Sequence, residues 1–459
     1  MSQTSRKQRI ALLLAAALAA GAMSGCGAPR GNDAAPAGSE ASSDAPKPGS
    51  KVIRIAHTYD PNSESGKGPH EWLEAGIARF VEENPEYRVE EEYYGMNEID
   101  NKLMSDYKAG ISHDLITVNT AQFAEQVASG GLKDMSPYFE GLSKEEQEDF
   151  TWLSDWDSYL DSEGKLRGIP YTLHTRVIAY NKDLFEAAGL DPDTPPQTME
   201  ELIEYAQKLT TDDVWGYGTF IGAGRATAEI AFSPYLWYFG GDLLDEEGNA
   251  DFASEAGVQA AQFLYDLIYK YKVTPEWAVS GDYFTTIRDP FLNGQYAMCD
   301  GVGNFIFDEL ERAGMISGAA TPSREAATNN IGFFLAPENS SRYVNGWAFS
   351  IAESCEDPEA AFKLMMCLYE PDIYQIGVGG FPVRKSMYDQ DIYQGEFWDV
   401  WKESLAAGRA LAPKSTTALQ LCDAVAAAIQ DCIIGKQPIQ ETLTRYEQEY
   451  NNQYGAGTH

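Results

Sequence analysis

Side chains that do catalysis or bind metal ions do not occur in this sequence at the spacings that known motifs require. It has no GxSxG, GxxxxGK[ST] or HExxH motif; "PHEWLE" (69–74) supplies only the first His and the Glu of the last. No CxxC pair is available to hold zinc, and the histidines are scattered, at His57, His70, His113, His174 and His459. Paired carboxylates of a glycosidase type are inevitable among 70 acidic residues and indicate little. We therefore expect no catalytic residue, no metal and no cofactor.

Two further segments could suggest a ligand loop. "GYGTFIG" (216–222) lacks the glycine spacing of a dinucleotide-binding turn and follows no convincing strand, so we interpret its glycines as turn residues. "DEEGNAD" (245–251) lacks the twelve-residue pattern of a calcium loop. It predicts an acidic hairpin turn instead.

The thiol of Cys26 follows an apolar run and precedes a segment of small and polar residues. Basic residues at positions 6, 7 and 9 lead into an apolar run over 10–22, which as a helix would span about 20 Å, less than the roughly 30 Å of a bilayer core. Residues 1–25 thus read as a signal peptide, and "MSGC" (23–26) resembles the lipobox of bacterial lipoproteins, whose cysteine carries acyl chains such as palmitate. A secretory signal with a chance cysteine is the alternative. Residues 26–50, rich in Gly, Ala, Pro and Ser, predict a flexible tether.

Composition limits the remaining possibilities. About 410 residues follow the tether, which is too long for one core and favours two domains. The formal charge of 34 minus 70, or −36, disfavours nucleic acid and direct binding to anionic membrane surfaces. Five cysteines remain after Cys26, and their odd number and wide spacing predict buried free thiols, with one pair as the alternative.

Short apolar strands alternate with amphipathic helices along the folded part. Strands are expected at 52–56, 87–94 and 114–118, each followed by a helix. Later helices are expected at 257–271, 357–369 and 419–434, and Thr198 with Glu201 forms a capping-box pattern. This rhythm predicts an α/β fold with a mainly parallel sheet, in which ligands bind at the carboxyl ends of strands.

Four segments resemble the extracellular solute-binding proteins of ABC importers, and in particular the sugar-binding group that includes the maltodextrin-binding proteins. They are residues 164–210, with "YNKDLF" and Gly189 in the usual order, "FLNGQYAMCDG" (291–301), "NGWAFSIAESCEDPEAAFKLMMCLY" (345–369) and "GGFPVRKS" (379–386). The resemblance covers nearly all of residues 51–459.

This resemblance implies a two-lobed periplasmic-binding-protein-like fold, in which two α/β lobes are joined by a hinge and close on the ligand. Mapped by the motifs, lobe 1 would comprise residues 51–172 plus 338–394, and lobe 2 residues 173–337 plus 395–459. Contacts that exist only when both lobes meet the ligand would shift the population towards the closed state.

Four candidate binding residues follow strands at their carboxyl ends. Tyr59 and Asp60 come after the first strand, where similar proteins place ligand-contacting polar residues; a turn at Asp60-Pro61 is the alternative. Asn119 leaves the third strand and Gln122 opens the next helix, and a helix-capping role for Asn119 competes with a binding role.

The remaining candidates come from the resemblance. His174 occupies the crossing where the maltodextrin binders place a ligand-binding glutamate, and Tyr171 beside it is either a stacking ring or hinge packing. Asp300 ends a strand at the rim of lobe 2, where its carboxylate could accept bonds from sugar hydroxyls. Gly303 stands where those relatives use a tryptophan that stacks on the sugar. Phe305, Trp237 or Trp347 could supply the stacking ring instead, and we prefer Trp347. The alternative for Trp347 is that it packs between the lobes.

The function that we expect is a lipid-anchored substrate-binding protein, not an enzyme, on the extracytoplasmic face of the cell membrane. It would capture a mono- or oligosaccharide as a monomer and deliver it to ABC permease transmembrane subunits. A same-family binder of a polyamine, a glycerol phosphate or a peptide is the first alternative, and a surface carbohydrate hydrolase is the second.

Overall fold

The structure is a computed structural model, and it describes residues 50–456 apart from several short segments. Those segments are residues 97, 112, 154, 304–306, 308–309, 311–312, 315, 318–326, 329, 337–341, 378–379, 391–392 and 413. It also describes no side chain for residues 64, 65, 316, 317, 327, 328 and 396. The expected signal peptide, Cys26, the tether up to residue 49 and Phe305 lie outside the described residues.

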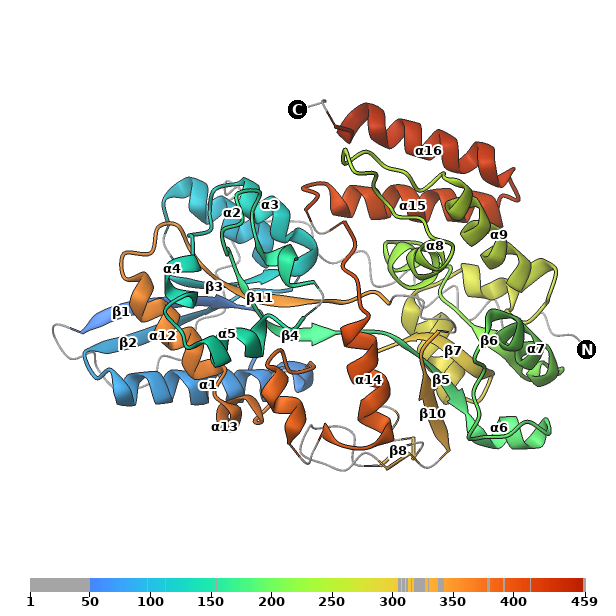
Figure 1. Cartoon of the computed structure of the whole chain (residues 1–459), viewed down its shortest axis with the longest axis horizontal. Coiled ribbons are helices and arrows are strands. Elements are labelled where there is room, and N and C mark those ends of the chain that lie inside the picture. Colours follow the sequence, from blue (N-terminus) through green and yellow to red (C-terminus); the bar gives the residue numbers. More distant parts are fainter. Residues whose placement is uncertain are drawn as a thin grey trace, which may run out of the picture. The chain divides into compact units, whose positions relative to one another are not determined.

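Five strands form the first sheet, in the order β2-β1-β3-β11-β4 (Figure 1). Their bounds are β1 Lys51–His57, β2 Tyr87–Tyr93, β3 Leu115–Asn119, β4 Ile169–His174 and β11 Asn345–Ile351. β1 runs parallel to β2 and β3, whereas β11 runs antiparallel to β3 and β4. The carboxyl ends of β1 to β4 and the start of β11 therefore share one edge, which we call the carboxyl edge of the first sheet.

A second sheet has the order β10-β5-β7-β6. Its strands are β5 Val177–Asn181, β6 Trp215–Gly218, β7 Tyr296–Val302 and β10 Ile331–Phe334, and a separate two-stranded sheet joins β8 Ile316–Ser317 to β9 Ala327–Thr328. β6 and β7 are parallel, and Val177 at the start of β5 pairs with Val302 at the end of β7. The carboxyl ends of β6 and β7 and the start of β5 therefore lie at one edge, which we call the carboxyl edge of the second sheet. The chain enters the sheet at this edge when it comes from β4.

The chain passes between the two sheets three times. β4 belongs to the first sheet and β5 to the second, so the first crossing is Thr175-Arg176, just past the expected limit at 172/173. β4 continues because His174 still pairs with Asn345 of β11. The second crossing lies between β10 and β11, and the third between α14 (Glu396–Ala406) and α15 (Ala418–Ile433). The lobe limits given above remain a prediction, and below lobe 1 and lobe 2 mean each sheet with its helices.

Helices cover both sheets. In lobe 1 they are α1 Glu64–Glu83, α2 Ile99–Ala109, η1 Thr120–Gln122, α3 Phe123–Ala128, α4 Ser136–Phe139, α5 Lys144–Phe150, η2 Trp156–Tyr159, α12 Pro358–Leu368, α13 Pro371–Tyr374 and η7 Lys385–Asp389. In lobe 2 they are α6 Lys182–Ala187, α7 Met199–Leu209, η3 Thr227–Phe232, α8 Ser233–Tyr238, α9 Glu255–Tyr269, η4 Glu276–Val279, η5 Phe284–Arg288, α10 Asp289–Leu292, α15 and α16 Ile439–Tyr454.

An aromatic cluster holds α1 and α12 against the first sheet. Trp72 of α1 is fully buried and donates from Nε1 to the carbonyl oxygen of Leu368 at 3.0 Å. Its ring centroid lies 5.5 Å from that of Tyr171 and 6.0 Å from that of Phe349. Rings at these separations contribute about 0.5–1.5 kcal/mol per pair beyond the area that they bury.

A second aromatic group, on α14, joins the two lobes. Trp401 is fully buried, and its ring centroid lies 5.2 Å from Phe381 and 5.5 Å from Phe333 of β10. Phe381 pairs through its backbone with Leu173 of β4. The hydrophobic core of lobe 1 therefore continues into the second sheet at this point.

Most of the expected elements are confirmed, and two interpretations are wrong. The sheets are mixed and not mainly parallel, because β11 runs antiparallel to β3 and β4, and β5 runs antiparallel to β7 and β10. The three early strands and the helices at 257–271, 357–369 and 419–434 occur within two residues of the expected bounds. "GYGTFIG" does not begin as a turn, because Trp215–Gly218 is strand β6 and a Cβ on Gly216 would lie 1.8 Å from the carbonyl oxygen of Ala206. Its first glycine, Gly216, thus permits α7 to pack closely on the strand.

The cysteines and the acidic turn agree with expectation. Cys299, Cys355, Cys367, Cys422 and Cys432 are free and buried. "DEEGNAD" forms a tight turn closed by the bond from the Asp245 amide to the Asn249 carbonyl at 2.8 Å. Among the described residues no helix combines the length and the apolar character that crossing a membrane requires.

One carboxyl group is buried beneath the carboxyl edge of the first sheet. Asp100 in the first turn of α2 is 4% exposed, and burial raises its pKa to about 7, although a hydrogen bond from the Asn119 backbone works in the opposite direction. Because the pKa is higher in the folded than in the unfolded chain, this group favours folding most below pH 4 and loses that contribution as the pH rises towards 7.

We therefore expect Asp100→Asn to stabilise the protein at pH 8 by on the order of 2 kcal/mol, and to change its stability little below pH 4. Chemical denaturation of both proteins at several pH values measures the difference. Glu98→Gln, which replaces an exposed carboxylate next to the same helix, is the matched control. An Asp100→Asn effect that does not vary between pH 4 and pH 8 contradicts the prediction.

Candidate functional site

The carboxyl edges of the two sheets meet at the first crossing, since β4 ends at His174 and β5 begins at Val177. On the lobe 1 side, β3 ends at Asn119 and leads into η1. The hydroxyl oxygen of Thr120 accepts a bond from the Gly346 amide at 3.0 Å, which ties this end of β3 to the start of β11. Gly346 is required there because a Cβ would lie 2.0 Å from the carbonyl oxygen of Thr172.

A small void of about 20 Å³ separates lobe 1 from lobe 2 at this point. Thr120 and Ala121 line it from lobe 1, Glu229 and Cys422 line it from lobe 2, and Tyr343 lines it from the second crossing. The void has room for a water molecule but is much smaller than the roughly 300–1,000 Å³ of a ligand pocket. Any larger ligand must displace or separate these elements.

Glu229 is the only acid among the described residues that line the void. It lies on η3, a short π-helix, and such helices often occur at functional sites. Burial raises the pKa of Glu229, and the positive charges of Arg176 and Arg225 only partly oppose this effect. A carboxyl group that keeps its proton longer can donate as well as accept hydrogen bonds, so it suits a hydroxylated ligand.

A larger cavity, of about 750 Å³, adjoins the void along the third crossing. Asp155 and residues of η2 line it from lobe 1, and the acidic turn and residues 454–456 line it from lobe 2. Six carboxylates contribute to the lining, together with two cationic side chains, Arg409 and Lys414; the carboxylates are Asp155, Asp157, Asp242, Asp245, Glu246 and Glu247. This lining favours neutral or cationic ligands and repels anions.

Asp155 is the most perturbed of these carboxyl groups, because burial raises its pKa to about 6. Arg409 forms an ion pair with Asp242, and its guanidinium lies 4.9 Å from the ring centroid of Trp237. The structure therefore places Trp237 next to the cavity, but beneath a guanidinium and only 8% exposed. As the structure stands, the guanidinium occupies the face on which a sugar would stack.

The carboxyl edge of the first sheet brings together four of the predicted residues, which are Asn119, Gln122, His174 and Trp347. Trp347 pairs with Asn119, and Asn345 beside it pairs with His174. The Asn119 side chain caps η1 by accepting from the Ala121 amide at 2.9 Å, which is the capping role that competed with binding. Gln122 ends η1 and is half-buried, as is His174.

The structure gives packing or turn contacts to the remaining lobe 1 candidates. Asp60 accepts from the Asn62 amide at 2.8 Å and so stabilises the turn before α1, which is the alternative considered for it. Tyr171 is fully buried with its ring centroid 4.3 Å from Phe349, so its ring cannot stack on a ligand. Tyr59 packs edge-on against Trp72 at 6.0 Å. Trp347 is 9% exposed and belongs to the core, as in the packing alternative.

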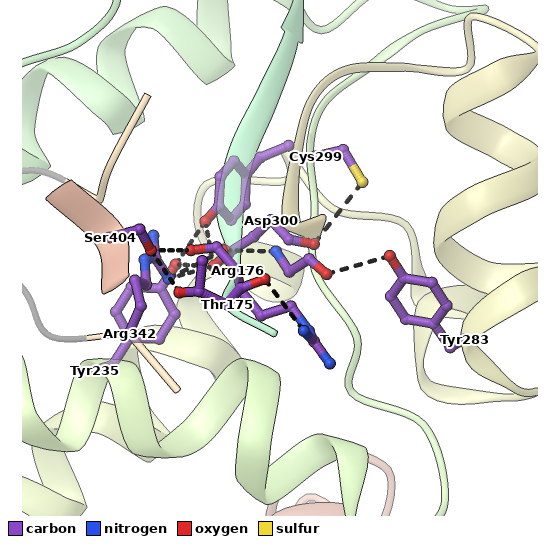
Figure 2. A network of polar contacts seen from close by, with 10 residues as sticks. Thr175, Arg176, Tyr235, Tyr283, Cys299, Asp300, Arg342 and Ser404 are labelled. Carbon is purple, nitrogen blue, oxygen red and sulfur yellow. Dashed lines mark hydrogen bonds and ion pairs between the residues drawn. The ribbon is translucent and has the colours of Figure 1, made fainter. Parts of the chain in front are cut away.

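The prediction that Asp300 lies at a ligand-accessible rim is wrong. Asp300 is fully buried near the end of β7, and its carboxylate accepts from Arg342 at 3.1 Å and from Tyr235 at 3.1 Å (Figure 2). It also accepts from Tyr217 at 2.9 Å. Arg342, 1% exposed, belongs to the second crossing. Gly301 does permit a close approach, with φ at +77°, but the approaching group is the Ile230 side chain and not a ligand.

The first crossing is held in the same region. Ser404 of α14 donates from its hydroxyl to the carbonyl oxygen of Arg176 at 2.9 Å, and its oxygen lies 2.6 Å from that of Thr175 (Figure 2). The crossings are therefore anchored to lobe 2 and α14 by buried polar contacts.

Sequence reasoning missed Glu229, Arg409 and the acidic residues around the cavity. Glu229 follows β6, so the rule that ligands bind at carboxyl ends of strands would have indicated it, had β6 been recognised. No sequence signal placed η2 opposite the acidic turn, because the two segments are more than 80 residues apart.

Comparison with known sequences identifies a family. A sequence model described as bacterial extracellular solute-binding protein matches residues 65–375. A probable amino-acid ABC transporter periplasmic-binding protein of Sinorhizobium fredii is 28% identical over 230 residues, which are 50% of each chain. The sn-glycerol-3-phosphate-binding periplasmic protein UgpB of Escherichia coli (strain K12) is 33% identical over 162 residues, 34% of this chain and 36% of UgpB. The chain therefore aligns with half or less of the length of these two relatives.

Comparison with solved structures confirms the predicted fold class. A solute-binding protein of an ABC transporter from Thermotoga lettingae TMO, bound with alpha-D-tagatose, has a TM-score of 0.69 and 22% identity, covering 88% of this chain and 99% of that one. At this identity the likeness establishes the fold alone, which is two-lobed.

The buried ion pair leads to a stability prediction. Arg342→Met leaves the Asp300 carboxylate buried without its cation, and we expect a loss of about 3–5 kcal/mol in the free energy of unfolding at pH 7. The double variant Arg342→Met/Asp300→Asn removes both charges and should recover part of that loss. Denaturant unfolding measures both, and a single variant within about 1 kcal/mol of the parent contradicts the role given to this pair.

Proposed function

We propose, because the chain belongs to the family of bacterial extracellular solute-binding proteins, that it captures a mono- or oligosaccharide between its two lobes. It would then deliver the sugar to the transmembrane permease subunits of an ABC importer. The family binds solutes and does not convert them, so the hydrolase alternative is set aside.

The single observation that supports a sugar best is the cavity beside the third crossing. Its volume of about 750 Å³ fits a small oligosaccharide, and residues from both lobes line it. Carboxylates accept hydrogen bonds from sugar hydroxyls, while Arg409 can donate to ring and hydroxyl oxygens. Glu229 and Thr120 extend these polar contacts to the adjoining void.

The charge of the lining bears on the alternatives. UgpB, by its name, binds sn-glycerol-3-phosphate, but six carboxylates against two cations would repel a phosphate. The same excess of carboxylates favours a cationic solute such as a polyamine, which is therefore the second candidate. Neutral sugar and polyamine differ in one measurable respect, because only the binding of the cation weakens strongly with added salt.

We also propose that the protein is held on the extracytoplasmic face of the cell membrane by lipid on Cys26. The signal-peptide pattern and the lipobox-like "MSGC" support this proposal, and the tether after them would let residues 51–459 reach a permease while remaining anchored. Mass spectrometry of the membrane-extracted protein tests it, since Cys26→Ser should remove both the acyl mass and the membrane association.

The proposed function is tested by thermal unfolding of the purified full chain against neutral sugars, polyamines and glycerol 3-phosphate. Saturation at about 100 times Kd stabilises a protein by about 2.7 kcal/mol, enough for a clear rise in Tm. We expect a rise with at least one sugar, little change with 0.3 M salt, and no chemical change in the sugar. A rise with polyamines alone would transfer the function to the second candidate.

For the solute that raises Tm most, we expect Glu229→Gln to weaken binding more than tenfold, measured by calorimetry. Tm without solute should stay the same or rise, because the variant removes a half-buried carboxylate whose charged form its surroundings disfavour. Glu255→Gln, which replaces an exposed acid on α9, should leave both values unchanged. Equal affinity for the parent and Glu229→Gln would place the solute away from the void.

A further inference from the structure

Two histidines and a glutamate that are distant in the sequence converge in lobe 1. His57 ends β1, Glu91 lies on the neighbouring parallel strand β2, and His70 lies on α1, which covers this face of the sheet. One ligand atom from each lies within 4.8 Å of the other two. None of the three lines the void or the cavity described above.

The separations suit a single ion. Nε2 of His70 lies 3.3 Å and Nε2 of His57 lies 3.6 Å from the same oxygen, Oε2 of Glu91. Ligand atoms at about 2.0–2.1 Å from a tetrahedral zinc ion are roughly 3.3–3.4 Å apart, so both separations are close to the edge of such a tetrahedron. The ligand nitrogens of the two histidines lie within 4.8 Å of each other, so the third edge is at most about 1.5 Å longer than in such a tetrahedron.

Two of the ligand atoms are buried without a hydrogen bond. His57 is 1% exposed, and its Nε2 and Oε2 of Glu91 both lack a hydrogen-bond partner among the described residues. Buried polar atoms are rarely left in this condition unless an ion or a water completes their contacts.

A carboxylate lies near the other ring nitrogen of His70. Nδ1 of His70 is 3.7 Å from Oε2 of Glu74, one turn along α1, which is an ion-pair separation longer than a hydrogen bond. If this contact shortens when a metal binds, it becomes the carboxylate–histidine pair that leaves the other nitrogen free for the metal.

We propose that His57, His70 and Glu91 bind one divalent transition-metal ion, zinc in the first place. Two imidazole nitrogens and one carboxylate oxygen form a donor set that zinc accepts, and the fourth position is left for water. The hard ions magnesium and calcium prefer all-oxygen ligands and are not expected there.

Binding has a cost at His57. The Tyr59 amide donates to Nδ1 of His57 at 3.2 Å, so in the metal-free protein the ring proton lies on Nε2. When the ion takes Nε2 this proton must move to Nδ1, and the Tyr59 amide must turn away. Metal binding therefore rearranges the start of the 58–63 segment, which leads from the carboxyl edge into α1.

The test is calorimetric titration of the full chain, without a histidine tag and after chelator treatment, with zinc chloride alone and with cobalt chloride alone. We expect one equivalent to bind with Kd of 10 μM or tighter. The cobalt complex should show the visible absorption of a four-coordinate ion. His70→Gln and Glu91→Gln should each weaken zinc binding at least tenfold.

Glu71→Gln is the matched control, because Glu71 neighbours His70 on α1, is exposed and pairs with Lys67. It should leave the zinc affinity unchanged. Circular dichroism and Tm without metal show that the variants are folded. Zinc binding that His70→Gln and Glu91→Gln leave intact, or the absence of binding by the parent at 100 μM zinc, overturns the proposal.

Discussion

The buried ion pair between Arg342 and Asp300 is the constraint on which the arrangement of the crossings depends. It joins the second crossing to the end of β7, at the edge of the second sheet where β5 also begins. Burying two charges is costly, and the structure compensates with hydroxyl donors from Tyr217 and Tyr235. Because the carboxylate is fully used in this way, it holds the chain in place and has no capacity left for a ligand.

The anchored crossings determine which side chains can face a solute. The hydroxyl of Thr120 ties β3 to β11, and Ser404 ties the first crossing to α14. Between these fixed points lie the void at Glu229 and the acidic cavity along the third crossing. The same crossings thus serve as the hinge of the proposed clamp and as part of its lining, which is a direct way to couple solute contacts to lobe position.

Lobe 1 carries a second set of polar residues beside its carboxyl edge. Tyr59 lies between the two sets, since its ring is 6.0 Å from His57 and 6.3 Å from Tyr171 in the aromatic cluster beneath the edge. A metal ion on His57 would act on the backbone of Tyr59, and a solute at the edge would meet the same segment. The two proposals nevertheless rest on different residues and fail independently.

The early strands, the long helices, the family and the free cysteines were readable from the sequence, because hydrophobic periodicity, capping residues and a long motif are local properties; strand β6 was not. The roles of single side chains were not. Asp300, Tyr171 and Trp347 look like binding residues in the chain, but β7, β4 and β11 carry them into the core, and only packing decides burial. The scattered His57 and His70 indicated no metal, yet parallel pairing of β1 with β2 and the placement of α1 bring them to Glu91. Side-chain chemistry is encoded residue by residue, whereas proximity across some 30 residues arises only when strands pair and helices pack.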